Sequence, residues 1–266
     1  MSRVRAPAVA GSFYPADPGR LGAMVDGFLA DAGEPAGNGR VEAVIAPHAG
    51  YVYSGPTAGF AFAALRTGIA AAKRVVVIGP SHFVSFRGIA MAGADAFRTP
   101  LGEVPLDREA RSSIDGLPEA VIADRPHAEE HAIEVELPFL QRLSAGFMLV
   151  PLVVGRAGPD EVARVLAAFR DDETLFVISS DLSHYEPYGS AQRHDEQTAV
   201  AIEGYAAERL RAEDACGHLA IAGLLREAAR RGLAIHRLDL RNSGDTAGPK
   251  DRVVGYGAWA FTEPRA

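Results

Sequence analysis

Residues 75–82 read VVVIGPSH, and this short stretch decides the fold class. An uninterrupted run of Val and Ile bounded by Gly and Pro is typical of a strand that is covered on both faces, as in parallel sheets. The same design recurs at 41–48, which reads VEAVIAPH, and at 175–181, which reads LFVISSD. The sequence therefore predicts three buried strands, each leading directly into polar residues.

Strand-like and helical patterns alternate along the rest of the chain. Further strands are expected at 148–154, 235–240 and 253–261, and helices at 57–69, 132–143, 159–169, 190–210 and 214–231. This alternation predicts an α/β fold whose central, mostly parallel or mixed sheet is flanked by helices. Short pieces divided by Gly and Pro predict an antiparallel excursion between 88 and 106. The Gly-rich stretch 33–39 is interpreted as a loop between elements, so residues 1–266 are expected to form a single domain.

Composition excludes several classes of function. The 266 residues are 48% hydrophobic and 23% charged, which is typical of a globular chain rather than a disordered one. A net charge of -7 argues against binding to nucleic acid or to an anionic membrane surface. We expect neither a signal peptide, because the first residues lack an uninterrupted apolar core, nor a membrane span, because no run approaches about 20 apolar residues. A single cysteine, Cys216, fits a reducing cytoplasm, and we expect it to be a small core residue without a functional role.

Residue types that bind metals gather where the predicted strands end. They are His48, His82, Asp181, His184 and, after the strand at 235–240, Asp245. Ligands of open α/β sheets bind beyond the carboxyl ends of the strands, where such loops converge. Imidazoles with carboxylates and without thiolates suit Fe(II), Mn(II) or Zn(II). Two His and one carboxylate leave open metal positions for a substrate and dioxygen, so a redox role is a reasonable hypothesis.

Seven ordered segments carry a resemblance to a known family. They are PAVAGSFYP (7–15), APHAGYVYSGPTAG (46–59), VIGPSHF (77–83), TPLGEVPLD (99–107), EEHAIEVELPFL (129–140), ISSDLSHY (178–185) and NSGDTAG (242–248). Together they resemble the Memo family, whose bacterial and archaeal members are called AmmeMemoRadiSam system protein B. That family is similar in fold to LigB-type class III extradiol dioxygenases, which are nonheme iron enzymes. The resemblance implies a LigB-like fold and a functional association with AMMECR1-like and radical-SAM proteins.

The resemblance also implies roles for individual residues. It makes His48, His82 and Asp245 the metal ligands and His184 the acid/base group, with Asp181 orienting His184 or replacing Asp245 as the carboxylate ligand. Fe(II) is the preferred ion, and Zn, Mn or Cu are also compatible. The implied activity is that of an oxygenase acting on a small, aromatic molecule.

Other polar residues of these segments are candidates for the surroundings of the site. By the same resemblance, His131 and Glu130 line the pocket and support catalysis or contact the substrate, whereas an alternative is that they cap a helix start. Substrate contacts are also assigned to Tyr51, Tyr53, Ser54 and Ser81. For the two tyrosines, aromatic packing over the edge of the sheet is an equal alternative.

Two different classes of function compete with an oxygenase. A binding or scaffold protein could keep a vestigial metal pocket. The segment HAEEH (127–131) also fits a zinc peptidase pattern, with two His on one helical face. However, Arg125 and Pro126 place any helix start at the motif itself, and a third ligand is assigned only loosely, to Glu134 or Glu136. We therefore expect that HAEEH is not a peptidase site.

Overall fold

A mixed nine-stranded sheet forms the centre of the computed structural model, which describes residues 3–33 and 39–263. Its strands are β2 (Val41–Ala46), β3 (Arg74–Pro80), β4 (Ile89–Met91), β7 (Ala120–Ile122), β8 (Met148–Val154), β9 (Thr174–Ser179), β10 (His184–Glu186), β11 (Ala234–Asn242) and β12 (Val253–Thr262). They run in the order β10-β12-β2-β9-β3-β8-β4-β7, with β11 paired to β12. The strands β2, β9, β3 and β8 are parallel, and β12 and β4 join them antiparallel.

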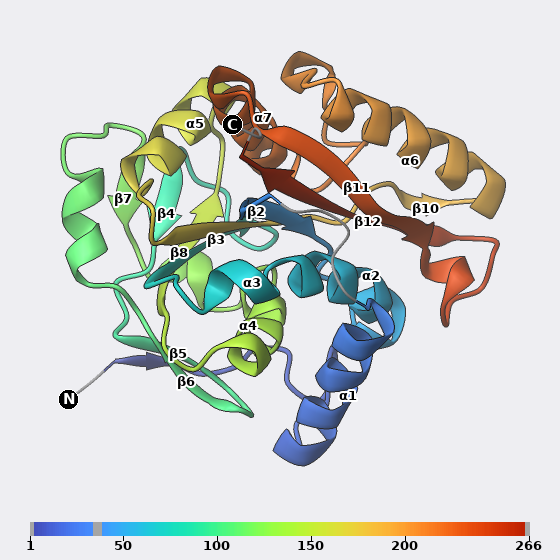
Figure 1. Cartoon of the computed structure of the whole chain (residues 1–266), viewed down its shortest axis with the longest axis horizontal. Helices are drawn as coiled ribbons and strands as arrows, with labels where there is room; N and C mark the ends of the chain where they lie inside the picture. The colour runs from blue at the N-terminus through green and yellow to red at the C-terminus, as the bar shows by residue number, and fades with distance from the viewer. Residues whose placement is uncertain (1–2, 34–38, 264–266) are drawn as a thin grey trace.

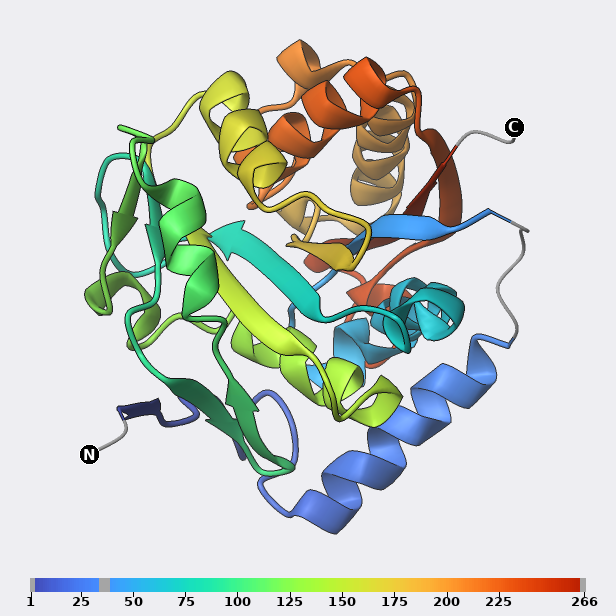
Figure 2. The same cartoon turned by 60° about the vertical axis from the view of Figure 1, so that its left-hand side comes forward.

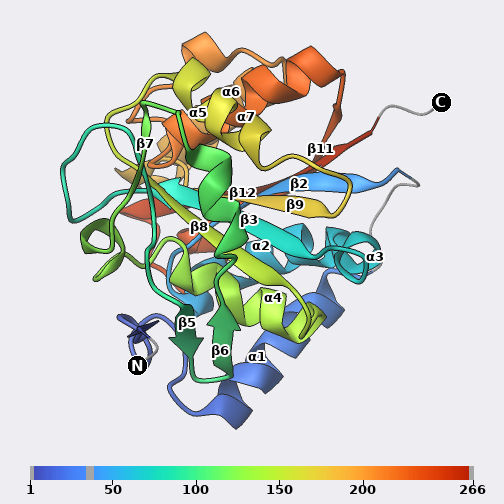
Figure 3. The same cartoon turned by 90° about the vertical axis from the view of Figure 1, so that its left-hand side faces the viewer.

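Helices cover both faces of this sheet (Figures 1 and 3). The helices α1 (Pro18–Asp31), α2 (Tyr51–Ala64), α3 (Arg66–Ile69) and α4 (Leu137–Leu143) cover one face, and α5 (Pro159–Ala168), α6 (Tyr188–Glu203) and α7 (His218–Arg231) cover the other. Figure 2 shows the two groups on opposite sides of the strands. The predicted α/β fold with a mixed, helix-flanked sheet is confirmed.

Strand periodicity explains why two cores form. In β2, Val44 packs in the core under α1 and α2, whereas Ile45 packs in the core under α5 and α7. In β3, Val75 and Val76 divide in the same way. Because successive side chains of a strand point to opposite faces, an unbroken apolar run fills both cores.

Several element boundaries differ from the sequence-based expectation. The expectation did not include helix α1, which starts at an Asp17 cap. Helix α2 already begins at Tyr51 and contains Pro56. The helix expected at 132–143 is a short 3-10 turn, Glu134–Glu136, followed by α4. Helix α6 ends at Glu203 before Gly204, and α7 begins at His218, four residues later than its expected start. Tertiary packing overrides local pattern most often at such ends.

The antiparallel excursion between 88 and 106 is confirmed. Strand β4 runs antiparallel to β8, and β5 (Ala96–Thr99) forms a hairpin with β6 (Gly102–Pro105) in a small second sheet with β1 (Val4–Arg5). Most of the loop expected at 33–39 lies outside the described residues.

Within the described ranges, no helix combines the length and the apolar character needed to cross a membrane.

Candidate metal centre

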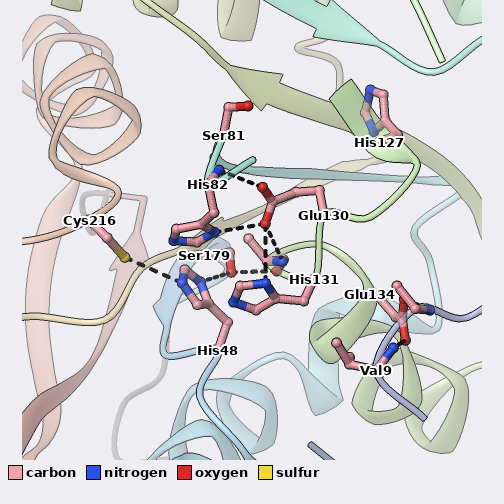
Figure 4. A network of polar contacts seen from close by, with 12 residues as sticks. Val9, His48, Ser81, His82, His127, Glu130, His131, Glu134, Ser179 and Cys216 are labelled. Carbon is pink, nitrogen blue, oxygen red and sulfur yellow. Dashed lines mark hydrogen bonds and ion pairs between the residues drawn. The ribbon is translucent and has the colours of Figure 1, made fainter. Parts of the chain in front are cut away.

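Three histidines converge beyond the carboxyl ends of β2 and β3 (Figure 4). His48 follows β2, His82 follows β3, and His131 comes from the segment before the Glu134–Glu136 turn. One ligand atom of each lies within 4.8 Å of the other two. The rings of His82 and His131 are stacked, with their centroids 4.6 Å apart, and His48 stands edge-on to both. This spacing suits three nitrogen ligands around one metal ion.

His48 is oriented by the neighbouring strand β9. Its Nδ1 lies 2.7 Å from the Ser179 Oγ, and its backbone N–H donates to the Asp181 Oδ1 at 2.8 Å. Burial, followed by the nearby His82, lowers the pKa of His48 to about 3. The ring is therefore neutral at pH 7, and its Nε2 can offer a lone pair.

Glu130 fixes both the backbone and the ring of His82. Its Oε2 accepts from the His82 N–H at 2.7 Å, and its Oε1 lies 2.8 Å from the His82 Nδ1. Burial opposes ionisation of Glu130, but hydrogen bonds from His82 and Ala132 lower its pKa to about 2. A carboxylate on Nδ1 directs the other ring nitrogen outward, which is the arrangement typical of metal-binding histidines. The same carboxylate raises the pKa of His82 against the effect of burial, so a metal must displace a proton there.

His131 completes the cluster from the other side. Its ring lies 4.9 Å from that of Phe13, and its side chain is only 14% exposed. Burial, followed by the nearby His48, lowers the pKa of His131 to about 4, so this ring is also neutral. Its Nδ1 is buried without a hydrogen-bond partner, and the nearest Glu130 oxygen is 3.6 Å away. A metal ion would satisfy such a lone pair.

A buried ion pair holds the segment that carries Glu130 and His131. Arg5 pairs with Glu134, and it also donates to the His127 carbonyl at 3.0 Å and to the Glu130 carbonyl at 2.6 Å. Glu134 additionally accepts from two backbone N–H groups, those of residues 8 and 9, and from the Tyr14 hydroxyl at 2.5 Å. The N-terminal segment is thus tied to the wall of the candidate site.

Asp181 lies next to His48, because its Oδ1 accepts from the His48 N–H. Asp181 is buried, and burial raises its pKa. His184 is exposed at the start of β10. His184 is not one of the three clustered ligands, and its predicted acid/base role stays a prediction.

Asp245 lies outside this cluster. Its Oδ2 accepts from the Asn242 N–H at 2.9 Å, and its Oδ1 accepts from the Tyr188 hydroxyl at 2.5 Å. It therefore caps the short Ser243–Asp245 turn, is exposed, and borders a separate polar hollow beside α6. The structure does not bring Asp245 to His48 and His82: one carboxylate oxygen serves this cap, and the other accepts from Tyr188.

The residues assigned to substrate contacts differ in their surroundings. Tyr51 is buried and donates to the Val135 carbonyl at 2.7 Å, Ser54 donates to the Ala49 carbonyl at 2.8 Å, and Ser81 donates to the Val84 carbonyl at 2.7 Å. These three hydroxyl groups donate to backbone carbonyls of the chain, whereas Tyr53 is 38% exposed. The predicted substrate contacts of all four residues stay predictions.

The HAEEH segment does not form the helix that a peptidase pattern needs. His127 lies in a 3-10 turn, Arg125–His127, and its Nε2 is 3.0 Å from the Ala90 carbonyl. It is buried beside Phe97, whereas His131 faces His48 and His82 (Figure 4). The two histidines of the motif therefore point to different places.

Cys216 is the residue of this site that sequence reasoning missed. Its Sγ lies 3.3 Å from the His48 Nε2 (Figure 4). It also accepts from the Asp181 N–H at 3.3 Å. Burial, followed by the charge of Asp181, raises the pKa of Cys216 to about 12, so the thiol is protonated. The available signal is Gly217: a Cβ there would lie 2.7 Å from Ser180, so only glycine lets this loop approach the end of β9.

His194 links the two segments that carry His184 and Cys216. Its Nδ1 lies 2.7 Å from Glu186 and its Nε2 2.8 Å from Asp214. Burial opposes protonation, but the hydrogen bonds to both carboxylates outweigh it and raise the pKa of His194. When protonated, the imidazole donates to both partners at once.

We expect His194→Gln to remove a pH-dependent part of the stability. Because the folded-state pKa is raised above its unfolded value near 6.5, this contribution is fully present below pH 6 and is lost as the pH rises through the folded-state pKa. Urea unfolding at pH 6 and pH 9 should show a larger difference between parent and variant at pH 6. His236→Gln is the control, because His236 contacts a hydroxyl instead of a carboxylate. An equal difference at both pH values would contradict the charged bridge.

The fold and the site define a class of protein: an α/β protein with a mixed sheet and a three-histidine candidate metal centre at the ends of its parallel strands. A sequence model described as Memo-like protein matches residues 5–260. The chain therefore belongs to the Memo family.

Similar proteins agree with this assignment. A MEMO1 family protein of Aquifex aeolicus is 36% identical, with 96% of this chain and 97% of the relative covered, and one of Archaeoglobus fulgidus is 36% identical, with 97% and 99% covered. A solved structure of an uncharacterized protein from Escherichia coli K12 is similar with a TM-score of 0.54, at 14% identity, covering 83% of this chain and 99% of that one. The last likeness concerns the fold alone.

Proposed function

We propose that this protein binds one divalent metal ion through His48, His82 and His131, and that the loaded protein is a nonheme iron enzyme of the dioxygenase type acting on a small molecule. The observation that carries the proposal is the convergence of three ligand atoms within 4.8 Å, two of them on neutral rings. Glu130 orients one ligand, and Cys216 and Asp181 stand next to another. The ligand set differs from the two-His-one-carboxylate set expected from the sequence, but three imidazoles also leave open positions, where a bound ion such as Fe(II) would take a substrate.

The residues around the cluster support chemistry more than a vestigial pocket. The buried Glu130 carboxylate holds the His82 ring in one orientation, as the outer partners of metal-binding histidines do. His184 is exposed and follows Asp181, which contacts His48, by three residues, so it could exchange a proton with a bound substrate. We propose further that the protein works in the cytoplasm, in association with AMMECR1-like and radical-SAM proteins.

Anaerobic metal titration tests the ligand set. We expect the parent to bind one Fe(II), and His48→Ala, His82→Ala and His131→Ala each to weaken binding by at least about 100-fold, since loss of an outer partner already costs about 10- to 100-fold. Glu130→Gln removes such an outer partner and should weaken Fe(II) binding by about 10- to 100-fold. His236→Ala on β11 is the matched control and should bind like the parent.

Two more variants separate the neighbouring donors. Asp245→Ala should keep full metal affinity, because that carboxylate caps the Ser243–Asp245 turn. Cys216→Ser should lower the affinity for the metal if the Cys216 sulfur acts as a fourth ligand. Unchanged affinity in all three histidine variants would refute the site. Stoichiometric metal without oxygen consumption on any catechol would favour the scaffold alternative.

A further inference from the structure

Two arginines lie side by side next to the paired ends of β4 and β8. Arg87 comes just before β4, and Arg156 comes just after β8. A parallel β-bridge joins the two residues: the Arg156 N–H donates to the Phe86 carbonyl at 2.8 Å, and the Gly88 N–H donates to the Arg156 carbonyl at 2.9 Å. Because paired residues of neighbouring strands lie about 4.8 Å apart and point to the same face, the two side chains leave the backbone together.

Two glycines permit this close approach of the backbone segments. A Cβ on Gly155 would lie 2.4 Å from the Phe86 carbonyl oxygen. Gly88 has a φ of +87°, and a Cβ there would lie 2.3 Å from the Glu119 carbonyl oxygen. Glycine is therefore required at both positions. The backbone thus fixes two like charges on paired strand positions, an arrangement that is destabilising unless an anion lies between them.

The structure does not provide that anion from within the chain. Both arginines are exposed, and among the described residues neither forms a side-chain hydrogen bond or an ion pair. Acids of the neighbouring segments already have other partners, in the pairs Glu119–Arg164, Asp160–Arg226 and Glu161–Gly158 N–H. The charges of Arg87 and Arg156 therefore remain available to a ligand.

Both arginines line one hollow of about 490 Å³. The remaining lining comes from Ala157, Leu219 and Glu161, whose Oε2 accepts from the Gly158 N–H at 2.5 Å. None of the three clustered histidines belongs to this lining, so the hollow is a place separate from the candidate metal centre. Its volume lies within the range of about 300–1,000 Å³ that is typical of sites for small organic molecules.

The charge of the hollow selects the class of ligand. The chain has a net charge of -7, so the protein as a whole repels anions, and two unpaired guanidinium groups at one hollow are a local exception. Each guanidinium presents a planar fork of donors that matches the oxygens of a phosphate group. Two positive charges balance a dianion, and a phosphate monoester carries about 1.5 to 2 negative charges at neutral pH.

We propose that the hollow beside Arg87 and Arg156 binds a small phosphate monoester. The two guanidinium groups contact the phosphate oxygens, and the organic part of the ester lies against Ala157 and Leu219. This site is additional to the proposed metal centre and needs no bound metal. Because the phosphate also separates two like charges, its binding stabilises the folded chain.

The test compares propyl phosphate, inorganic phosphate and 1-propanol in calorimetric titrations of the metal-free protein at pH 8 and low salt. We expect the parent to bind propyl phosphate about 3- to 10-fold more tightly than inorganic phosphate, because the propyl group adds apolar contact, and not to bind 1-propanol. Arg87→Gln and Arg156→Gln should each weaken binding of both phosphates by about 10- to 100-fold, as is typical of a lost charge-assisted hydrogen bond.

Arg226→Gln is the matched control. It removes the same charge from α7, but Arg226 has Asp160 as its partner at 3.7 Å, so this variant should bind both phosphates like the parent. Leu219→Ala should lose the preference for propyl phosphate and keep the affinity for inorganic phosphate. Urea unfolding confirms first that each variant is folded.

Three results would overturn the inference. The first is an unchanged affinity for propyl phosphate in both Arg87→Gln and Arg156→Gln. The second is an equal loss in Arg226→Gln, because net charge alone would then explain the binding. The third is a parent that binds propyl phosphate no more tightly than inorganic phosphate, because the hollow would then hold a free ion only. None of these results depends on the metal centre, which the anaerobic metal titration tests separately.

Discussion

Glu134→Ala should lower the free energy of unfolding by about 3–5 kcal/mol, because it leaves a buried cation without its partner. Arg5 and Glu134 have side chains that are 7% and 0% exposed. The mutation also removes the acceptor for the Tyr14 hydroxyl and for two backbone N–H groups. Urea unfolding of the metal-free protein measures the loss.

The control for Glu134→Ala is an ion pair at the surface. Arg98 and Glu103 pair across the β5–β6 hairpin with side chains that are 53% and 49% exposed, so Glu103→Ala should cost less than about 1 kcal/mol. Glu134→Gln keeps a hydrogen-bond acceptor, so its loss in the free energy of unfolding should lie between those of Glu134→Ala and Glu103→Ala. A loss below about 1 kcal/mol in Glu134→Ala would mean that the N-terminal segment is not anchored by this pair.

His184→Gln should reduce oxygen consumption with a catechol that the parent oxidises by about 100- to 10,000-fold, the range typical of lost acid/base catalysis. An extradiol-type reaction must take a proton from a substrate hydroxyl and later return one, which histidine can do near neutral pH. His184 suits this role because it is exposed and follows the buried Asp181, which holds the His48 backbone, by three residues.

Metal content separates this role from that of a ligand. The variant should bind Fe(II) like the parent, because the three clustered ligand atoms do not include one from His184. Loss of iron would make His184 a ligand instead. His218→Gln is a control, because His218 lies at the start of α7 and its Nδ1 contacts the Ala215 carbonyl. Full activity in His184→Gln would leave that residue without a catalytic role.

Local pattern was sufficient for the fold class. The runs at 41–46, 75–78 and 175–178 form the parallel centre of the sheet, since an apolar run can only be buried on both faces. Because His48 and His82 directly follow two of these strands, their convergence also follows from local pattern. Helix α1 was not predicted from the sequence. The predicted helix ends were also wrong, because packing and capping residues decide where a helix begins and ends.

Only the tertiary structure decided which other residues meet these two histidines. His131 is held there by Arg5, whose contact with Glu130 spans 125 positions, and Cys216 reaches His48 across 168 positions. The family resemblance assigned Asp245 to the site, but its side chain instead caps the short Ser243–Asp245 turn. The apolar pattern of a strand acts within a few residues and is visible in the sequence. The meeting of loops depends on strand order, buried pairs and close glycine contacts, which no spacing along the chain encodes.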